Sequence, residues 1–354
     1  MIYNPLAGGK GKKPLRRREC RSRQVQEEEG EVTVAIEVAR TAHRVVADYM
    51  AVKPGETVLI VVDDRTSPSI WQSLAAQTLA IGGDPVVTMM APRARSGMEP
   101  PDPIAAAMRT ANVVIAAASR SMYHIEAKNA AKKAGARGVF NAPHGEDGWI
   151  NGAMTADFLE IRKTAERLRD RLARGKVAHV SSPAGTDVLM VIEGRRPVGW
   201  LTGVCRNPGE VSAFPGGEVS LPPLEGTTQG RIVIEHIMTD IGRLQQPIAW
   251  IVEKGHAVRF EGGVEARALE QHIAGVENAT NIAELGIGLN PKSRLTGEIT
   301  EVKKRLGTVH MALGDSAAGY GGAVTSDVHL DGMILNPRVE IDGEVIVENG
   351  RVLV

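Results

Sequence analysis

The chain has 354 residues, enough for about two domains of ordinary size and for a large core that needs no disulfide staples. Its 42 Lys and Arg balance 42 Asp and Glu, so the formal net charge is zero and we expect neither nucleic acid nor an anionic membrane as a partner. Two cysteines, Cys20 and Cys205, lie in no metal or redox spacing, and the sequence has neither a signal-peptide core nor a membrane-length apolar stretch, so we expect a cytoplasmic protein.

Residues 1–31 combine a basic stretch with an acidic run. Eight Lys and Arg fall within residues 10–23, and four glutamates follow between positions 27 and 31. Blocks of like charge repel one another and offer little apolar surface for packing. We therefore predict a flexible tail, with a basic arm that binds nucleic acid as the alternative.

Residues 32–154 alternate between helical periodicity and short apolar runs. The pattern predicts strands over 57–62, 86–90, 113–118 and 138–140, and helices over 33–50, 67–81, 103–110 and 123–134. Apolar strands separated by helices are typical of a parallel sheet that is covered on both faces, so we predict a doubly wound α/β domain. No GxGxxG follows any of these strands, which disfavours a dinucleotide site.

Residues 155–175 have an apolar position every three or four residues and predict one long helix that bridges two domains. Residues 176–354 then predict a β-rich α+β domain with Gly-rich turns. Strands are expected over 178–181, 188–193, 232–234, 248–252 and 258–261, with a helix over 264–272. Asp342-Gly343 and Asn349-Gly350 lie between alternating β-formers and predict two hairpins.

Residues 310–334 are the densest run of metal-ligand side chains. His329 and Asp331 are two residues apart, so in an extended strand they lie on the same face and can converge on one ion. His310 can join them. The alternative is a surface turn in which His329 and Asp331 are solvated.

Two glutamates stand in apolar surroundings elsewhere in this half of the chain. Glu218 follows the turn Phe214-Pro215-Gly216-Gly217, and Glu284 lies between small and aliphatic residues. An unpaired buried carboxylate costs several kcal/mol, so each needs a cation. A metal ion is one answer, and a neighbouring Arg or Lys, such as Arg267 or Arg294, is the other.

Four segments, FPGGEV, AELGIGLNP, HMALGD and SDVHLDGMI, occur in this order across residues 214–334. Together with SSPAGTDVLMVIEGR at residues 181–195 and the α/β first domain, they resemble the aminopeptidase T (M29) metallopeptidases. They are equally similar to the related 2,5-dihydroxypyridine 5,6-dioxygenases. The resemblance extends over most of the chain after residue 33, and we expect a metalloenzyme with its active site in the cleft between the two domains.

The peptidase resemblance implies a two-metal site, with metal ligands at Glu218, Glu284, His310, His329 and Asp331. It further implies Glu218 or Glu284 as a bridging ligand or base and a catalytic tyrosine, for which Tyr320 is the nearest residue. The dioxygenase resemblance implies a single Fe(II) at positions 284, 329 and 331, where those enzymes have His, His and Asp. The glutamate at 284 favours Zn, Mn or Co and metal-assisted hydrolysis.

His124 follows the apolar strand at 113–118, at the end of the sheet where α/β proteins bind ligands. Its segment, SRSMYH, resembles the dioxygenase segment whose histidine contacts the hydroxypyridine ring, so His124 is a candidate acid, base or orienting residue; an exposed histidine at a helix start is the alternative. His144 and His179 are weaker candidates. Cys205 has no signature of an activated thiol.

These observations lead to a metal-dependent hydrolase as the first interpretation and a Fe(II)-dependent ring-cleaving dioxygenase as the alternative. A non-catalytic binding protein on an enzyme scaffold is a third. The expected partner is a small molecule or short peptide as substrate, with no nucleic acid and no membrane, and we expect a homo-oligomer.

Overall fold

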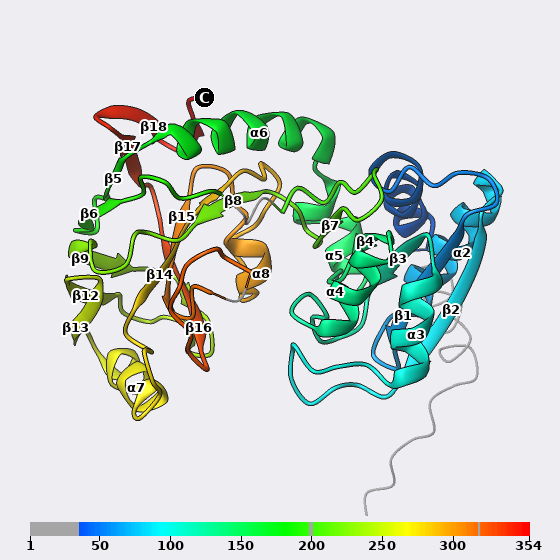
Figure 1. The fold of residues 1–354 in the computed structure, drawn as a ribbon, viewed down its shortest axis with the longest axis horizontal. Helices are drawn as coiled ribbons and strands as arrows, with labels where there is room; N and C mark the ends of the chain where they lie inside the picture. The colour runs from blue at the N-terminus through cyan, green and yellow to red at the C-terminus, as the bar shows by residue number, and fades with distance from the viewer. Residues whose placement is uncertain (1–34, 198–200, 318) are drawn as a thin grey trace, which may run out of the picture.

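The computed structural model describes residues 35–197, 201–317 and 319–354. The chain forms two halves, and the long helix α6 (Phe158–Arg174) leads from the first half into the second along one side of the molecule (Figure 1). The predicted flexible tail and Cys20 lie outside the described residues. Among the described residues, none of the helices combines the length and the apolar character needed to cross a bilayer.

A five-stranded parallel sheet forms the centre of the first half, with strand order β2-β1-β3-β4-β7. Its strands are β1 (Thr57–Asp63), β2 (Asp84–Met90), β3 (Val113–Ala116), β4 (Arg137–Val139) and β7 (Val211–Ser212). Residues 35–43 are helical and continue into a π-helical turn. The remaining helices of this half are η1 (Arg44–Tyr49), α2 (Pro68–Ile81), α3 (Asp102–Thr110), α4 (Glu126–Lys133), α5 (Asp147–Ile150) and η2 (Gly152–Thr155).

The central strand β1 shows why this sheet needs helices on both faces. Val58, Ile60 and Val62 pack into one cluster of buried side chains, and Leu59 and Val61 pack into another. Successive side chains of a strand point to opposite faces, so a continuous apolar run has to be buried on both sides. The predicted doubly wound α/β fold is confirmed.

Side chains of the edge strand β2 remain partly exposed, which corrects the prediction that the sheet is covered along both faces. Val86, Val87 and Met89 are 39%, 38% and 57% exposed, although the strand reads as an apolar run. The reason is strand order, because β2 pairs only with β1 and forms the edge. The sheet also gains a strand from outside residues 32–154, since the chain returns at β7 to pair with β4.

The second half contains two antiparallel sheets. The larger has the order β13-β12-β9-β6-β5-β17-β18-β19, and the smaller has the order β11-β10-β16-β15-β14-β8. Strands of the larger sheet are β5 (Val177–Ser181), β6 (Asp187–Val191), β9 (Gln229–Ile234), β12 (Ile248–Glu253), β13 (His256–Glu261), β17 (Arg338–Ile341), β18 (Glu344–Glu348) and β19 (Arg351–Val352). Strands of the smaller sheet are β8 (Glu218–Leu221), β10 (Ile237–Met238), β11 (Gly242–Arg243), β14 (Ile282–Gly288), β15 (Val309–Gly314) and β16 (His329–Ile334).

The described residues of this half also form the helix α7 (Val264–Ile273) and the short helix α8 (Ile299–Val302). Both predicted hairpins are present, with β17 paired to β18 and β18 paired to β19. Asp342 and Asn349 adopt φ values of 55° and 51°, the left-handed conformation that such tight turns require. Figure 1 shows α8 on the side of the smaller sheet that faces the first half, next to β14, β15 and β16.

Candidate metal centre

Four neighbouring strands of the smaller sheet bring the predicted ligands together. In order across the sheet these strands are β16, β15, β14 and β8. Register pairs align the donors on one face, because residues that are directly opposite or two apart share a face. The donors are Glu218 on β8, Glu284 on β14, His310 on β15, and His329 and Asp331 on β16.

Small residues opposite the donors provide the space for them. Gly286 lies directly across from His310, and a Cβ at this position would come within 2.0 Å of His310 Nε2. Ala312 lies across from both Glu284 and Asp331. The glycine and alanine of AELGIGL and HMALG are therefore part of the site, because larger side chains would displace the donors.

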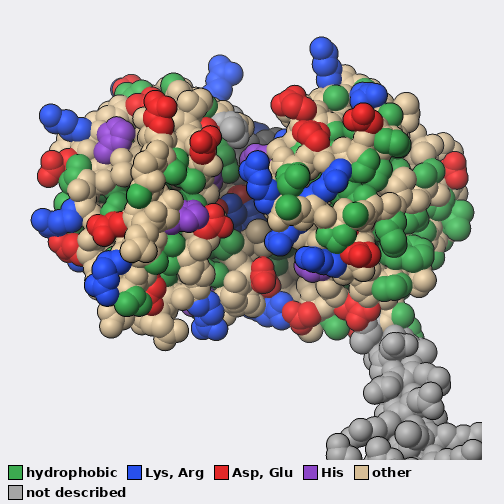
Figure 2. Space-filling view, turned by 90° about the horizontal axis from the view of Figure 1, so that it is seen from below, with side chains coloured by type: hydrophobic (Ala, Val, Ile, Leu, Met, Phe, Trp, Pro, Cys, Tyr) green, Lys and Arg blue, Asp and Glu red, His purple; other side chains and the backbone are tan. Residues whose placement is uncertain are grey.

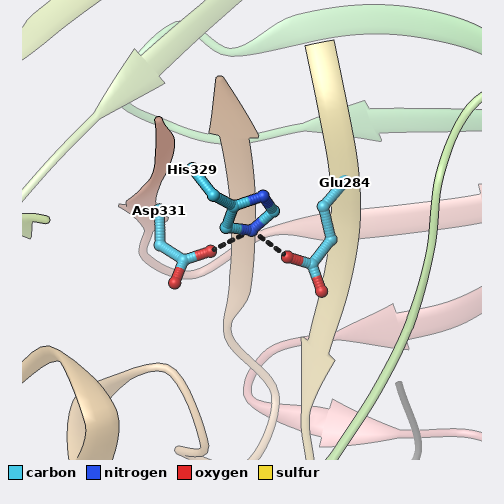
Figure 3. Close-up of side chains that lie close together, drawn as sticks. All are labelled: Glu284, His329 and Asp331. Atoms are coloured by element: carbon cyan, nitrogen blue, oxygen red, sulfur yellow. Dashed lines mark hydrogen bonds and ion pairs between the residues drawn. The ribbon is translucent and has the colours of Figure 1, made fainter. Parts of the chain in front are cut away.

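Glu284, His329 and Asp331 form the first donor set (Figure 3). His329 Nε2 lies 2.9 Å from Glu284 Oε2 and 3.5 Å from Asp331 Oδ1. One donor atom from each residue falls within 4.8 Å of the others. All three side chains are largely buried, so the alternative of a solvated surface turn is wrong.

Glu218, His310 and Glu284 form a second donor set beside the first. His310 Nε2 lies 3.7 Å from Glu218 Oε2 and 3.8 Å from Glu284 Oε1. Both His310 ring nitrogens, Glu218 Oε2 and Asp331 Oδ1 are buried without a hydrogen-bond partner among the described residues. Buried polar atoms are nearly always satisfied, so a cluster of unsatisfied ones fits divalent ions between these donors.

Two lysines that the sequence analysis did not name pair with the outer oxygens of Asp331 and Glu218, so for Glu218 a lysine fills the role that the alternative gave to a neighbouring Arg or Lys. Lys303 Nζ lies 2.9 Å from Asp331 Oδ2, and Lys304 Nζ makes a short ion pair with Glu218 Oε1. The oxygens left unsatisfied, Asp331 Oδ1 and Glu218 Oε2, are the ones that face the histidines. Each lysine thus fixes its carboxylate with one oxygen directed into the donor cluster.

The electrostatics of the first set call for a cation. Burial alone would lower the pKa of His329, but hydrogen bonds and charge from Asp331 and Glu284 outweigh burial and raise it to about 10. Burial alone would raise the pKa of Asp331, yet Lys303 and His329 hold it below its usual range. His310 and His329 likewise hold the pKa of Glu284 well below its usual value against the effect of burial. The same carboxylates that favour a proton on His329 would also favour a metal ion beside its Nε2.

Neighbouring groups fix the orientation of His329. Its Nδ1–H donates to the backbone carbonyl of Asp315 at 2.7 Å, which leaves Nε2 for the donor cluster. Metal-binding histidines are commonly held this way. The ring of Tyr320 stacks on the imidazole, with centroids 4.2 Å apart and planes 7° from parallel.

A cavity of 610 Å³ opens over this cluster, and both halves of the molecule line it. Figure 2 shows it as the furrow between the halves, with basic and histidine side chains inside. Glu218, Lys303, Tyr320, His329 and Asp331 line the wall formed by the second half. Tyr123 and His124 line the opposite wall, and the volume is that of a small-molecule site.

His124 faces the metal centre across the cavity. Its ring centroid lies 6.0 Å from that of Tyr320 and 5.1 Å from that of Tyr123. Burial, followed by the charge of Lys128, lowers the pKa of His124 to about 4, so its ring is neutral at pH 7. His124 lines the cleft and keeps part of its surface open to solvent, close to the start of α4 at Glu126, so the alternative of an exposed helix-start histidine stays open.

The other sequence candidates lie elsewhere. His144 does not line this cavity, and His179 is hydrogen-bonded to Asp187 and Glu340 on the larger sheet. Cys205 is fully buried and burial raises the pKa of its thiol, which agrees with an unreactive residue. Arg294 pairs with Asp147 and Glu301 rather than with Glu218 or Glu284, so the arginine alternative is wrong for this residue.

The architecture and the donor cluster are those of a metalloenzyme fold that resembles both the M29 aminopeptidases and the 2,5-dihydroxypyridine dioxygenases, which are also called NicX. Residues 40–354 match the family described as NicX: 2,5-dihydroxypyridine 5,6-dioxygenase, and the chain belongs to this family. No curated protein sequence matches the chain.

Two solved structures confirm the predicted resemblance at the level of the fold. The 2,5-dihydroxypyridine dioxygenase from Pseudomonas putida KT2440 is 17% identical, with a TM-score of 0.78 over 90% of this chain and 97% of that one. Wild-type AmpT from Thermus thermophilus is 16% identical, with a TM-score of 0.63 over 90% of this chain and 99% of that one.

Proposed function

We propose that the chain is a metal-dependent hydrolase that cleaves an amide or peptide bond of a small substrate. The observation that supports this most is the position of Glu284. Its Oε2 faces His329 at 2.9 Å, and its Oε1 faces His310 at 3.8 Å. A carboxylate shared by two donor sets is the arrangement expected of hydrolytic metal pairs, whose ions lie about 3.5–4 Å apart.

The residues fit divalent Zn, Mn or Co. Glu284, His329 and Asp331 would hold one ion, and Glu218 and His310 with Glu284 would hold the other. Bound there, the metal would lower the pKa of a coordinated water and polarise the substrate carbonyl. Carboxylate and imidazole are suitable ligands for these ions.

Other side chains would position the ligands and the substrate. Lys303 and Lys304 keep Asp331 and Glu218 from turning away from the cluster. Burial, followed by the charge of Glu284, holds the pKa of Tyr320 well above its usual value, so its hydroxyl stays protonated and can donate a hydrogen bond to the substrate. His124, neutral at pH 7, can accept one from the opposite wall.

A Fe(II)-dependent ring-cleaving dioxygenase is the second candidate, and membership of the dioxygenase family favours it. The first donor set argues against it. Non-haem Fe(II) oxygenases normally use two imidazoles and one carboxylate, whereas this set has one imidazole, His329, and two carboxylates, Glu284 and Asp331.

Metal content and two activity assays on the same protein distinguish these functions. Protein purified without oxygen would be analysed for metals and then assayed for dipeptide cleavage and for oxygen uptake with 2,5-dihydroxypyridine, with Fe(II), Mn, Co and Zn in turn. A hydrolase should hold two Zn, Mn or Co per chain and cleave amides. Oxygen uptake with a single iron and no amide cleavage under any metal would replace the proposed function with the second candidate.

The variant Glu284→His sharpens the test because it creates a two-histidine, one-carboxylate set. A hydrolase should lose one metal and amide cleavage should fall by about 100-fold or more, since even substitutions around a metal ligand typically cost about 10–100-fold. A dioxygenase should keep one iron and its oxygen uptake. Glu253→Gln, at an exposed carboxylate on β12, is the control.

A further inference from the structure

The first half contributes two arginines to the wall that faces the metal centre. Arg95 lies on the loop after β2, and Arg120 lies on the loop after β3. Hydrogen bonds join the two loops, from Ser121 N–H to Ser96 Oγ at 3.2 Å and from Gly97 N–H to the Ser121 carbonyl at 3.0 Å. Both arginines therefore extend from one connected surface at the carboxyl ends of parallel strands, where α/β folds bind ligands.

Neither arginine has an ion pair with a carboxylate in the part of the chain that the structure describes. The residues of the first half that line the cavity also include no Asp or Glu. In Figure 2, Lys and Arg side chains lie along the edge of this half that borders the furrow. This wall of the cavity has an excess of positive charge.

Each carboxylate that lines the cavity has a basic side chain beside one of its oxygens, and the free oxygens of Glu218 and Asp331 face the donor histidines. Glu218 pairs with Lys304, Asp331 pairs with Lys303, and Asp240 lies 3.5 Å from His272. A substrate with a free amino group would need an unpaired carboxylate to bind its ammonium. A substrate with a carboxylate meets two unpaired guanidinium groups, whose N–H donors match carboxylate geometry.

We propose that Arg95 and Arg120 form an anion subsite that binds a carboxylate of the substrate, so that the enzyme acts on small carboxylate-bearing amides such as N-acyl amino acids. This inference rests on the proposed function, because amides built from amino acids end in a carboxylate that can reach this wall while the amide lies over the metal ligands. The cavity of 610 Å³ accommodates a molecule of this size.

Two probes of nearly equal shape test the subsite. N-Acetylglycine has a carboxylate where N-acetylglycinamide has a neutral amide, and calorimetric titration of Zn²⁺-loaded protein with each gives the preference for charge. We expect the carboxylate probe to bind at least tenfold more tightly, since hydrogen bonds to charged groups contribute roughly tenfold to a hundredfold in affinity. The preference should shrink as ionic strength rises.

Variants assign the preference to the arginines. Arg95→Gln and Arg120→Gln should each weaken binding of N-acetylglycine about tenfold, and the double variant should bind both probes equally. Binding of N-acetylglycinamide should not change. Arg109→Gln, at an exposed arginine on α3 outside the cavity, is the control. Thermal unfolding should be unchanged in all of them, because both wall arginines are exposed.

A preference that survives in the double variant would overturn the inference, because the metal centre or its lysines would then bind the carboxylate. Equal binding of both probes to the unmodified protein would overturn it as well. The proposed function is judged separately by amide cleavage and metal content. If binding depends on the arginines but no amide is cleaved, the anion subsite stands and the hydrolase proposal fails. If neutral amides are cleaved and the protein shows no preference for the carboxylate probe, the hydrolase proposal stands and the subsite fails.

Discussion

The two walls of the cleft hold charge in different ways. On the second-half wall, every charged group has a partner within a few ångströms, as in Lys304 with Glu218, Lys303 with Asp331, and His329 with Glu284. On the first-half wall, Arg95 and Arg120 have no carboxylate partner among the described residues, and His124 is neutral at pH 7. The charged groups of the second-half wall are paired with one another, whereas the arginines of the first-half wall are free to pair with a substrate in the cleft.

This difference separates two tasks. Ligands on adjacent β-strands are fixed by the sheet, as rigid metal sites require, and the lysines orient them further. Loops at the ends of parallel strands can change without disturbing a sheet, which suits substrate recognition. Changes in the sheet wall should therefore affect metal binding and stability, whereas changes in the loop wall should affect substrate affinity.

Glu284→Gln should have the largest effect. The amide keeps the shape of the side chain but removes a negative charge that both donor sets share. We expect the metal content per chain to fall below about a tenth of that of the unmodified protein and the activity to fall by about 100-fold or more. Elemental analysis and amide cleavage measure both. Full metal content in this variant would show that Glu284 is not a ligand.

Lys303→Met tests whether the charges of the sheet wall are interdependent. Removing the ammonium takes away the nearest cation of the buried Asp331, which lies 2.9 Å from Lys303 Nζ, and breaking a buried pair typically costs about 3–5 kcal/mol. We expect the metal-free variant to lose about 3 kcal/mol of unfolding free energy. Added Zn²⁺ should recover most of this loss, because the ion supplies the missing positive charge.

Denaturant unfolding with and without a chelator gives these values. Lys176→Met is the matched control, because Lys176 pairs with Glu193 on the surface, where such pairs contribute about 0–1 kcal/mol. An equal loss in both variants would mean that Lys303 is an ordinary surface lysine. A large loss that Zn²⁺ does not restore would mean that Lys303 supports the fold rather than the metal centre.

The sequence predicted the clustering of Glu284, His329 and Asp331 better than it predicted the surroundings of that cluster. Glu284, His329 and Asp331 stand in local segments whose pattern is visible in the chain, and strand periodicity places the last two on one face. Lys303 and Lys304 follow the four-residue helix α8, which is too short for a periodic signal, and their partners are on β16 and β8. The exposure of β2 could not be predicted from the sequence either, because it depends on the order of the strands in the sheet, which no local pattern encodes.

The metal-free protein should lose stability as pH rises. The pKa of His329 is raised to about 10 in the folded state, above its value of about 6.5 in an unfolded chain. A raised pKa means that the folded state binds the proton more tightly, so its contribution is fully present below pH ~6.5 and is lost as pH approaches ~10. Bound metal replaces that proton, so Zn²⁺-loaded protein should show a flatter profile in this window.

Urea unfolding at several pH values, with and without a chelator, provides the comparison. Parallel profiles for the two forms would contradict the view that a proton and a metal ion compete for Nε2 of His329. Metal affinity should also increase with pH over the same window, because binding releases the proton.

Substitutions of Tyr320 should have the smallest effect. Two of them distinguish the role of the aromatic ring from that of the hydroxyl. The ring lies parallel to the imidazole of His329 at 4.2 Å, and such aromatic pairs contribute about 0.5–1.5 kcal/mol. The raised pKa of the hydroxyl makes it a hydrogen-bond donor at neutral pH rather than a base. Tyr320→Phe keeps the stacked ring, and Tyr320→Leu removes it.

We expect Tyr320→Phe to lower kcat/KM by about tenfold or less, the value of one hydrogen bond to the substrate, and to leave metal content unchanged. Tyr320→Leu should also weaken metal binding, by roughly three- to tenfold, because His329 loses the ring that holds its plane. Metal competition with a chelating dye and steady-state kinetics measure the two quantities independently. If Tyr320→Phe instead abolished cleavage while both variants kept full metal affinity, the hydroxyl would act directly in the reaction, and the stacked ring would matter only for placing it.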